Sequence, residues 1–106
     1  MQSQFRVHVR HEEGGTVIAV SGELDLASSP ALEERLDEVF GSDAELVVLD
    51  LRELEFMDST GLTLLTRWSR EAGQDGYELA LIRGEDRVHR LFEITGMAAY
   101  FAFVDG

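Results

Sequence analysis

The sequence predicts an α/β fold in which a mixed β-sheet packs against helices. Apolar and polar residues alternate near the start of the chain, as in a half-buried strand. The apolar run 46–49 is typical of a strand buried on both faces of a parallel sheet. Three other segments carry the apolar spacing of amphipathic helices. The expected order is β-β-α-β-α-β-α-β, and 106 residues without linkers or repeats indicate a single domain, residues 1–106.

The first two strands are expected to form a hairpin. Residues 5–10 alternate between apolar and polar side chains, and Thr16–Val20 is a second β-prone run. Glu13-Gly14-Gly15 lies between them, and a Gly-Gly pair in that position indicates an antiparallel turn. Ser21-Gly22-Glu23-Leu24-Asp25 is then expected to leave the second strand through a turn.

A helix follows this turn. Ser29 suits the N-cap, Pro30 suits the first helical position, and Gly41 suits the end of the helix. One apolar stripe runs along the helix, and charged residues cover its other side. The stripe consists of Leu32, Leu36, Val39 and Phe40.

The central part of the chain predicts a β-α-β unit. Residues 46–49 form its first strand, and Tyr77–Ile82 form its second, parallel strand. The helix between them is expected to start near Ser59 and to run to Ala72, with Gly73 just beyond its end. Its buried stripe is predicted to contain Leu62, Leu65, Trp68 and Ala72.

The last elements are a third helix and a strand. The helix is predicted over about Asp86–Thr95, and Gly96 followed by Met97 fits a helix-terminating motif. Tyr100–Val104 is the expected last strand. The predicted buried face of the helix contains Val88, Leu91, Phe92 and Thr95.

The charge of the chain restricts its partners. It contains 21 acidic residues against 9 basic ones, which gives a formal net charge of −12. Nucleic acid and anionic membrane surfaces would repel such a chain, so a basic surface on another protein is the better expectation. The absence of cysteine excludes disulfides and thiolate chemistry. No signal peptide and no membrane-spanning apolar run are present, so a soluble cytoplasmic protein is predicted.

The segment Phe56-Met57-Asp58-Ser59-Thr60-Gly61-Leu62 joins the central strand to the second helix. The first N–H groups of a helix lack partners and its dipole favours negative charge, so a hydroxyl there can carry a phosphate. Asp58 would oppose that charge. Gly61 lacks a side chain, so a partner can approach the backbone. The alternative is structural, because Asp, Ser and Thr before an apolar helix commonly do no more than cap it.

Three separated motifs resemble the STAS domain family, and in particular the bacterial anti-sigma factor antagonists. Val47-Val48-Leu49-Asp50-Leu51 followed by the segment 56–62 resembles the family signature. Residues 21–25 are similar to the family's Gly-Glu-Leu-Asp turn, and residues 90–97 are similar to the end of its third helix. The resemblance covers nearly the whole chain. It implies a STAS-like mixed sheet with the helices packed mainly on one face.

The resemblance also implies roles for individual residues. In this family the serine of Asp-Ser-(Ser/Thr)-Gly is phosphorylated by a partner that is both anti-sigma factor and serine kinase, which points to Ser59. Asp58, Thr60 and Gly61 would complete the partner-binding surface, and Asp25 would flank it. The unphosphorylated protein would bind the anti-sigma factor and release sigma. Phosphorylation would break that complex, and a serine phosphatase would restore it.

Under this interpretation the chain is a binding protein that needs no cofactor or metal, and it is not an enzyme. The second interpretation is a STAS scaffold whose binding does not depend on phosphate, within a larger signalling or transport assembly. Relatives often continue into a further C-terminal helix, whereas this sequence stops at Gly106 just after its last predicted strand.

Other polar residues are weaker candidates for chemistry. His8 and His11 would point to opposite faces of a strand, roughly 10 Å apart, so we expect exposed side chains and no metal site. His89 has no evident ligand partner and is expected at the surface. Asp50 ends the predicted central strand, like the acceptor of a response-regulator receiver, but the chain lacks that family's early acidic pair. Trp68 is expected in the core.

Overall fold

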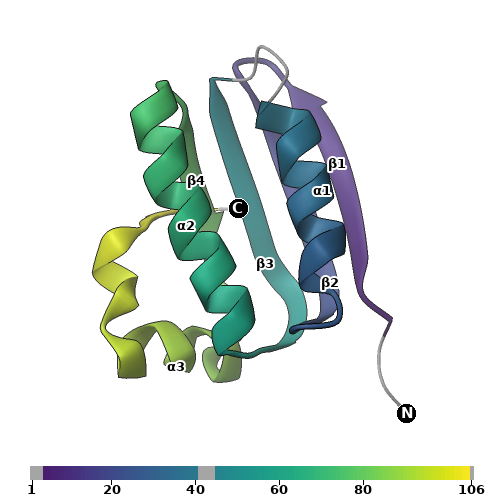
Figure 1. Ribbon diagram of the computed structural model, residues 1–106, viewed down its shortest axis with the longest axis vertical. Helices are drawn as coiled ribbons and strands as arrows, with labels where there is room; N and C mark the ends of the chain where they lie inside the picture. The colour runs from purple at the N-terminus through teal and green to yellow at the C-terminus, as the bar shows by residue number, and fades with distance from the viewer. Residues whose placement is uncertain (1–3, 41–44, 106) are drawn as a thin grey trace.

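The computed structural model describes residues 4–40 and 45–105 (Figure 1). One sheet has the order β1-β2-β3-β4-β5, in which β1 is antiparallel to β2 and the other neighbours are parallel. The predicted order of strands and helices is confirmed. The elements are β1 (Arg6–Glu12), β2 (Gly15–Leu24), α1 (Ser29–Phe40), β3 (Leu46–Met57), α2 (Ser59–Asp75), β4 (Glu78–Ile82), α3 (Asp86–Thr95), the 3-10 helix η1 (Met97–Tyr100) and β5 (Ala102–Val104).

The N-terminal hairpin forms as predicted, but its second strand is longer. The expectation that Ser21–Asp25 leaves the strand is wrong, because β2 continues to Leu24. The register of its pairing with β3 shifts before and after Gly22. These β-bulges let the strand continue through its polar residues. Gly22 has a φ of 86°, and a β-carbon there would lie 2.5 Å from the carbonyl oxygen of Gln4. Only glycine fits this position without strain.

The central strand β3 is also longer than its apolar run. It pairs in parallel with β2 on one side and with β4 on the other, so the predicted β-α-β unit is confirmed. Instead of ending near Asp50, it continues to Met57. The extensions of β2 and β3 pair with each other, and Leu24 lies opposite Met57. Each extension thus satisfies backbone groups of the other, which local composition does not reveal.

The helices α1 and α2 lie side by side across one face of the sheet, and α3 packs near the start of α2 (Figure 1). This arrangement agrees with the expected packing on mainly one face. The apolar stripes of the helices and alternate residues of the strands form one core. All predicted members of the α2 stripe are buried, including Trp68. None of the described helices is both long and apolar enough to cross a membrane.

The start of α1 differs by one residue from the prediction. Ser29 is its first residue, so Pro30 is the second. The amide of Leu32 donates to the carbonyl oxygen of Ser28 at 3.5 Å, which gives Ser28 the N-cap position. The expected terminator Gly41 and the side chain of Phe40 lie outside the residues described.

The end of α2 lies beyond the glycine expected to stop it. The helix passes through Gly73 and ends at Asp75. Gly76 is the C-cap, and its amide donates to the carbonyl oxygen of Ala72. Gly73 and Gly76 are both suited to end a helix, and local sequence does not show which of them does so.

The third helix has the predicted bounds, Asp86–Thr95, and Gly96 is its C-cap. Its residues Val88 and Phe92 are buried, whereas Thr95 is exposed. The last strand is shorter than predicted, because Tyr100 ends η1 and only Ala102–Val104 pair with β4.

The opposite face of the sheet has a different composition. Val17, Ala80 and Ile82 are buried but lie outside the main core, at positions that alternate with core residues of the same strands. Exposed arginines stand on the same face, Arg10 opposite Val17 on β1 and Arg52 on β3. One face of the sheet is therefore apolar and helix-covered, and the other mixes apolar residues with charges.

Candidate functional site

Ser59 is the first residue of α2, directly after β3 and its N-cap. The N-cap is Asp58, whose Oδ1 accepts a hydrogen bond from the amide of Gly61 at 3.1 Å. The capping role, which the sequence left open among three polar residues, therefore belongs to Asp58. Ser59 is exposed, and its hydroxyl has no hydrogen-bond partner among residues 4–40 and 45–105. The hydroxyl is thus accessible to an incoming phosphoryl group.

The junction between β2 and α1 is built around Asp25. Its Oδ1 accepts hydrogen bonds from the amides of Ala27 at 3.1 Å and Ser28 at 3.0 Å, an Asx turn. The Ser28 hydroxyl donates to the carbonyl oxygen of Glu23 at 2.7 Å. Ser29 is buried, and its hydroxyl donates to the carbonyl oxygen of Asp25 at 2.7 Å. Both serine hydroxyls of this junction are therefore engaged.

The two junctions lie next to each other, because β2 and β3 are parallel and end together. Leu24 pairs with Met57, and the amide of Asp58 donates to the carbonyl oxygen of Leu24 at 3.1 Å. Asp25 follows Leu24 and Asp58 follows Met57, so the structure brings both aspartates to the same edge of the sheet. Ser59 lies at this edge together with Thr60, which is half-buried.

Gly61 lies inside the protein and not at its surface. A β-carbon on Gly61 would lie 2.8 Å from Leu24 Cγ, 2.9 Å from Met57 Cγ and 3.0 Å from the Leu24 carbonyl oxygen. The expectation that this glycine makes room for a partner is therefore wrong. It makes room for Leu24 and Met57, and so lets the first turn of α2 rest directly on the end of β2.

Two hollows border Ser59, one on each side of α2. The first, of about 320 Å³, lies between α1 and α2 and is lined by Ser29, Glu33, Ser59, Thr60, Thr63, Leu64 and Arg67. The second, of about 410 Å³, lies between α2 and the α3–η1 segment and is lined by Ser59, Leu62, Thr63, Thr66, Arg67, Arg70, Thr95 and Met97. None of these lining residues is a histidine or cysteine. The hollows thus offer Ser59 no adjacent imidazole to act as its general base.

An ion pair crosses the first hollow. Arg67 Nη2 lies 2.8 Å from Glu33 Oε1, and both side chains are a little under half exposed. Sequence reasoning missed these two residues, which are 34 positions apart. One signal was available: Thr63 and Arg67 fall four and eight residues after Ser59, on the same face of the helix.

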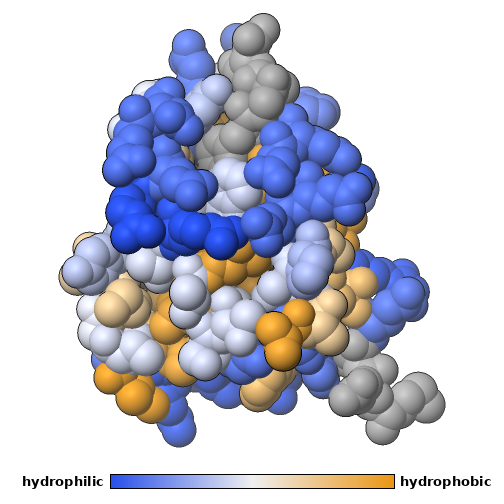
Figure 2. Space-filling model, in the orientation of Figure 1, coloured by the Kyte–Doolittle hydropathy of each residue, from blue (hydrophilic) through white to orange (hydrophobic). Residues whose placement is uncertain are grey.

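Exposed apolar side chains border both junctions. Leu26, just after Asp25, is 73% exposed, and Phe56, just before Met57, is 48% exposed. Figure 2 shows hydrophilic residues gathered over the half of this face where α1 and α2 end, and less hydrophilic ones over the half where they begin. An exposed hydroxyl with exposed apolar residues nearby along the chain suits contact with another protein.

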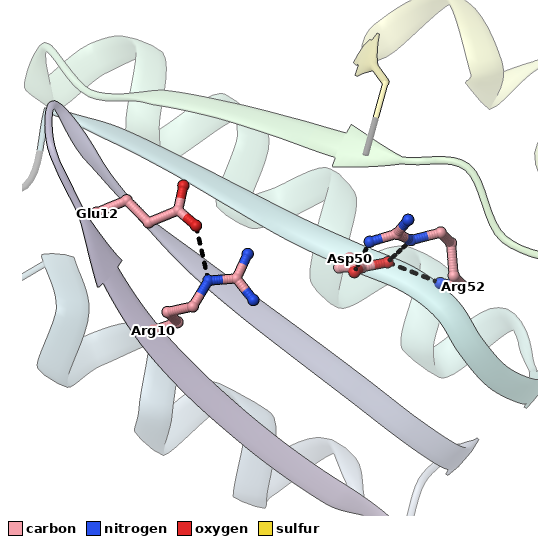
Figure 3. A network of polar contacts seen from close by, with 4 residues as sticks. All are labelled: Arg10, Glu12, Asp50 and Arg52. Atoms are coloured by element: carbon pink, nitrogen blue, oxygen red, sulfur yellow. Dashed lines mark hydrogen bonds and ion pairs between the residues drawn. The ribbon is translucent and has the colours of Figure 1, made fainter.

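Asp50 belongs to a separate polar group on the other face of the sheet (Figure 3). The Arg52 side chain donates to both Asp50 carboxylate oxygens, at 3.0 and 2.8 Å, and its amide donates at 3.0 Å. These hydrogen bonds lower the pKa of Asp50 even though partial burial acts to raise it. Arg10, which pairs with Glu12 at 2.7 Å, adds a weaker effect in the same direction. Asp50 is thus an ionised carboxylate held by Arg52 within the strand, and it does not end the strand as expected.

The histidines are not part of the site. His8 and His11 are exposed on β1, as predicted. His89 was expected at the surface but is buried, with ring centroids 5.7 Å from Phe92 and 5.1 Å from Phe103. The chain after α3 returns to pack Phe103 against this helix, a contact that helix periodicity cannot show. The described residues contain no cluster of three or more His, Cys, Asp or Glu able to hold a metal ion.

Comparison with known proteins covers the whole fold. The profile of the STAS domain family matches residues 6–105. An anti-sigma F factor antagonist of Paenibacillus polymyxa is 32% identical over 94 residues, 88% of this chain and 80% of the relative. An anti-sigma-B factor antagonist of Staphylococcus aureus (strain NCTC 8325 / PS 47) is 38% identical over 80 residues, 76% of this chain and 74% of the relative.

A solved structure agrees with these relatives. The crystal structure of an anti-sigma factor antagonist from Mycobacterium paratuberculosis superposes with a TM-score of 0.88 and 26% identity, over 97% of this chain and 87% of the other. The profile match runs from the first residue of β1 to beyond the last residue of β5. The chain belongs to the STAS domain family.

Proposed function

We propose that the chain is an anti-sigma factor antagonist whose binding is switched off by phosphorylation of Ser59. In the proposed cycle, residues 1–106 act as one domain in the cytoplasm and bind an anti-sigma factor that is also a serine kinase, which releases a sigma factor. The kinase phosphorylates Ser59 and the complex dissociates. A serine phosphatase then restores the binding form.

The observation that carries this proposal is the hydroxyl of Ser59, which is exposed and has no hydrogen-bond partner among the described residues. Asp58 caps α2 by itself, so a phosphoryl group on Ser59 leaves the cap hydrogen bond to Gly61 in place. Modification is therefore expected to change the charge of the surface without unfolding the helix. The names of the two curated relatives, antagonists of anti-sigma F and anti-sigma-B factors, support the class of partner.

The proposed partner-binding surface is the edge where the two junctions meet. It consists of Asp25, Asp58, Ser59 and Thr60, with the buried Gly61 beneath them. The exposed residues Leu26 and Phe56 are close to it along the chain. A phosphate adds about −1.5 to −2 charges next to Asp58. If the partner surface is complementary to a neutral hydroxyl, binding must remove water from the added phosphate without a compensating positive charge. The affinity of the complex then falls.

The proposed role is binding and not catalysis. The residues that line the two hollows beside Ser59 include no histidine or cysteine, and their one carboxylate, Glu33, is paired with Arg67. The second candidate function is a scaffold within a larger signalling or transport assembly. It is favoured by Leu26 and Phe56, because contacts through these exposed apolar side chains do not require a phosphate switch.

Phosphate mapping tests the acceptor. Wild type, Ser59→Ala and Ser28→Ala are incubated with ATP and the anti-sigma kinases of the same organism, and the modified residue is located by mass spectrometry. We expect one phosphate on Ser59, lost in Ser59→Ala and retained in Ser28→Ala, whose hydroxyl belongs to the other junction. Phosphate found mainly on Thr60 or elsewhere would contradict the assignment.

Calorimetry against the anti-sigma partner tests the switch. Ser59→Asp is expected to weaken binding by about tenfold to a thousandfold, which corresponds to about 1.4–4 kcal/mol. Ser59→Asn has nearly the same shape without the charge, so it separates electrostatic from steric effects. If Ser59→Asp binds as tightly as Ser59→Asn and wild type, charge at this position is not the switch and the scaffold function is favoured.

A further inference from the structure

Arg67 is an arginine that lines both hollows bordering Ser59. Ser59, Thr63 and Arg67 follow one another at intervals of four residues, so they lie along one face of α2. Eight residues of helix separate Ser59 from Arg67 by about 12 Å along the axis. Long helical side chains lean toward the helix N-terminus, so the Arg67 guanidinium lies on the side of its own Cα that faces Ser59.

In the unmodified protein Arg67 already has a partner, the carboxylate of Glu33 on α1, at 2.8 Å. Both side chains remain more than 40% exposed. Exposed single ion pairs are weak, because water screens them and both long side chains lose freedom. Arg67 can therefore exchange this partner for a stronger anion at little cost.

We infer that Arg67 is the intramolecular receptor for a phosphate on Ser59, and that phosphorylation transfers its guanidinium from Glu33 to the phosphate. This inference rests on the proposed phosphorylation of Ser59 and specifies how the modified state is held. A phosphate carries up to twice the charge of a carboxylate and offers three acceptor oxygens. Guanidinium binds such a group through two parallel N–H···O bonds.

The geometry of the first hollow supports the transfer. Ser59 and Arg67 are both in its lining, Thr63 lies between them, and Glu33 is on the opposite wall. The long, flexible Arg67 side chain extends toward Ser59 and so shortens the separation along the helix. Thr63 is exposed and presents a short hydroxyl side chain along this path.

The exchange changes more than one charge at the partner surface. Once Arg67 pairs with the phosphate, the Glu33 carboxylate loses the counterion it has in the unmodified protein. The modified protein thus presents the phosphate and an unpaired Glu33 on the same side of α2. This adds a second negative group to the switch on a chain whose net charge is already −12.

The test uses full-length protein in which phosphoserine is incorporated at position 59 during synthesis, so no kinase is needed. The second pKa of the phosphate is measured by ³¹P NMR titration in the wild-type background and in Arg67→Gln, Arg67→Lys, Glu33→Gln and Arg70→Gln. Arg70 is the matched control, because it is an exposed arginine on the same helix that lines the second hollow only. The helix dipole and Asp58 are the same in all variants, so differences report the substituted residue.

We expect the phosphate pKa to be about 0.5–1 unit higher in Arg67→Gln than in wild type, because an adjacent cation favours the dianion. Arg67→Lys should give an intermediate value, and Glu33→Gln a value below wild type, because it frees Arg67. Arg70→Gln should match wild type. Equal values in wild type and Arg67→Gln, or equal shifts in Arg67→Gln and Arg70→Gln, would overturn the inference.

The outcomes for Arg67 and for the proposed function are distinguishable. If kinases of the organism never modify Ser59 but the incorporated phosphoserine shows the Arg67-dependent pKa, the proposed function fails and the pairing stands. If Ser59 is modified by these kinases and the pKa of its phosphate does not depend on Arg67, the inference fails and the proposed function stands.

Discussion

At the β2–α1 junction and at the β3–α2 junction, an aspartate follows the last residue of a strand and serines stand close behind it. In the first junction Asp25 binds two amides, and the hydroxyls of Ser28 and Ser29 donate to backbone carbonyls. In the second, Asp58 binds one amide, and the hydroxyl of Ser59 has no partner in the described parts of the chain. Two similar sets of residues thus differ in outcome: the first junction engages its serine hydroxyls, and the second leaves the Ser59 hydroxyl without a partner in the described chain.

The spacing of each set explains this difference. Three residues separate Asp25 from Ser29, which lets the chain fold back and satisfy its own polar groups before α1 begins. Asp58 stands directly before Ser59, so the cap is complete as soon as α2 starts and the next side chain faces outward. A serine near a helix start is therefore a candidate acceptor only if the cap does not need it.

The comparison depends on the contact between the two junctions at Gly61, and breaking this contact should have the largest effect. Gly61→Ala places a β-carbon within 3.0 Å of Leu24 and Met57, so we expect a loss of about 1–3 kcal/mol in unfolding free energy. The matched control is Gly73→Ala, in the same helix, where a β-carbon meets nothing within 4 Å. It should raise stability by up to about 1 kcal/mol, because alanine has the higher helix propensity.

Urea denaturation of both variants measures the two changes. Opposite signs are the expected result. Equal stabilisation by both substitutions would show that α2 does not rest closely on the end of β2 at Gly61.

A smaller effect should separate the two serines. Ser29→Ala removes a buried hydroxyl that donates to Asp25, which should cost roughly 1 kcal/mol. Ser59→Ala removes an exposed hydroxyl without a partner in the described chain, so its stability should stay within about 0.5 kcal/mol of wild type. Thermal and urea unfolding of the two variants give the comparison. A larger loss in Ser59→Ala than in Ser29→Ala would contradict the different roles of the two serines.

The smallest effect concerns an aspartate outside both junctions. Asp50→Asn removes the carboxylate that Arg52 holds, and should cost about 0.5–1 kcal/mol near neutral pH because solvent screens this pair. The pKa of Asp50 is lowered in the folded protein, so the unfolded chain takes up the proton first as pH falls. The extra stability of wild type over Asp50→Asn is therefore fully present above about pH 4, the ordinary pKa of aspartate. It is lost as pH falls through the lower pKa that Asp50 has in the folded protein.

Urea titrations of wild type and Asp50→Asn between neutral and acid pH follow this difference. The affinity for the proposed anti-sigma partner serves as the control and should not change at neutral pH, because Asp50 is on the other face of the sheet from the helices. A difference in stability that widens as pH falls would mean that folding raises the pKa of Asp50 instead of lowering it.

Much of the fold could be predicted because the order of strands and helices follows from local hydrophobic periodicity and helix-end residues. Asp86–Thr95 is the clearest case, since its apolar spacing and its terminating glycine agree. The failures have non-local causes. Local sequence predicts a turn over Ser21–Asp25, but β2 continues to Leu24 because β3 supplies its pairing partners. His89 reads as a surface residue but is buried by aromatic residues that follow the helix.

The candidate site was predicted in part. Sequence placed Asp25, Asp58 and Ser59 near one another, and the parallel pairing of Leu24 with Met57 brings them to one edge. It gave Gly61 the wrong surroundings, because the residues that pack on it come from two different strands. It missed the Glu33–Arg67 pair, because no local pattern connects side chains on two helices.

The pairing of Leu24 with Met57 has a consequence for when the chain can be modified. The site contains residues from 24–29 and from 57–67. These two segments come together through the pairing of β2 with β3, which forms only when the sheet is assembled. A nascent chain, or a short peptide with the same residues around Ser59, lacks half of this surface. Under the proposed function, a kinase that recognises the assembled edge would therefore modify folded molecules only, and the amount of phosphate would measure the pool of the protein that has already reached its native state.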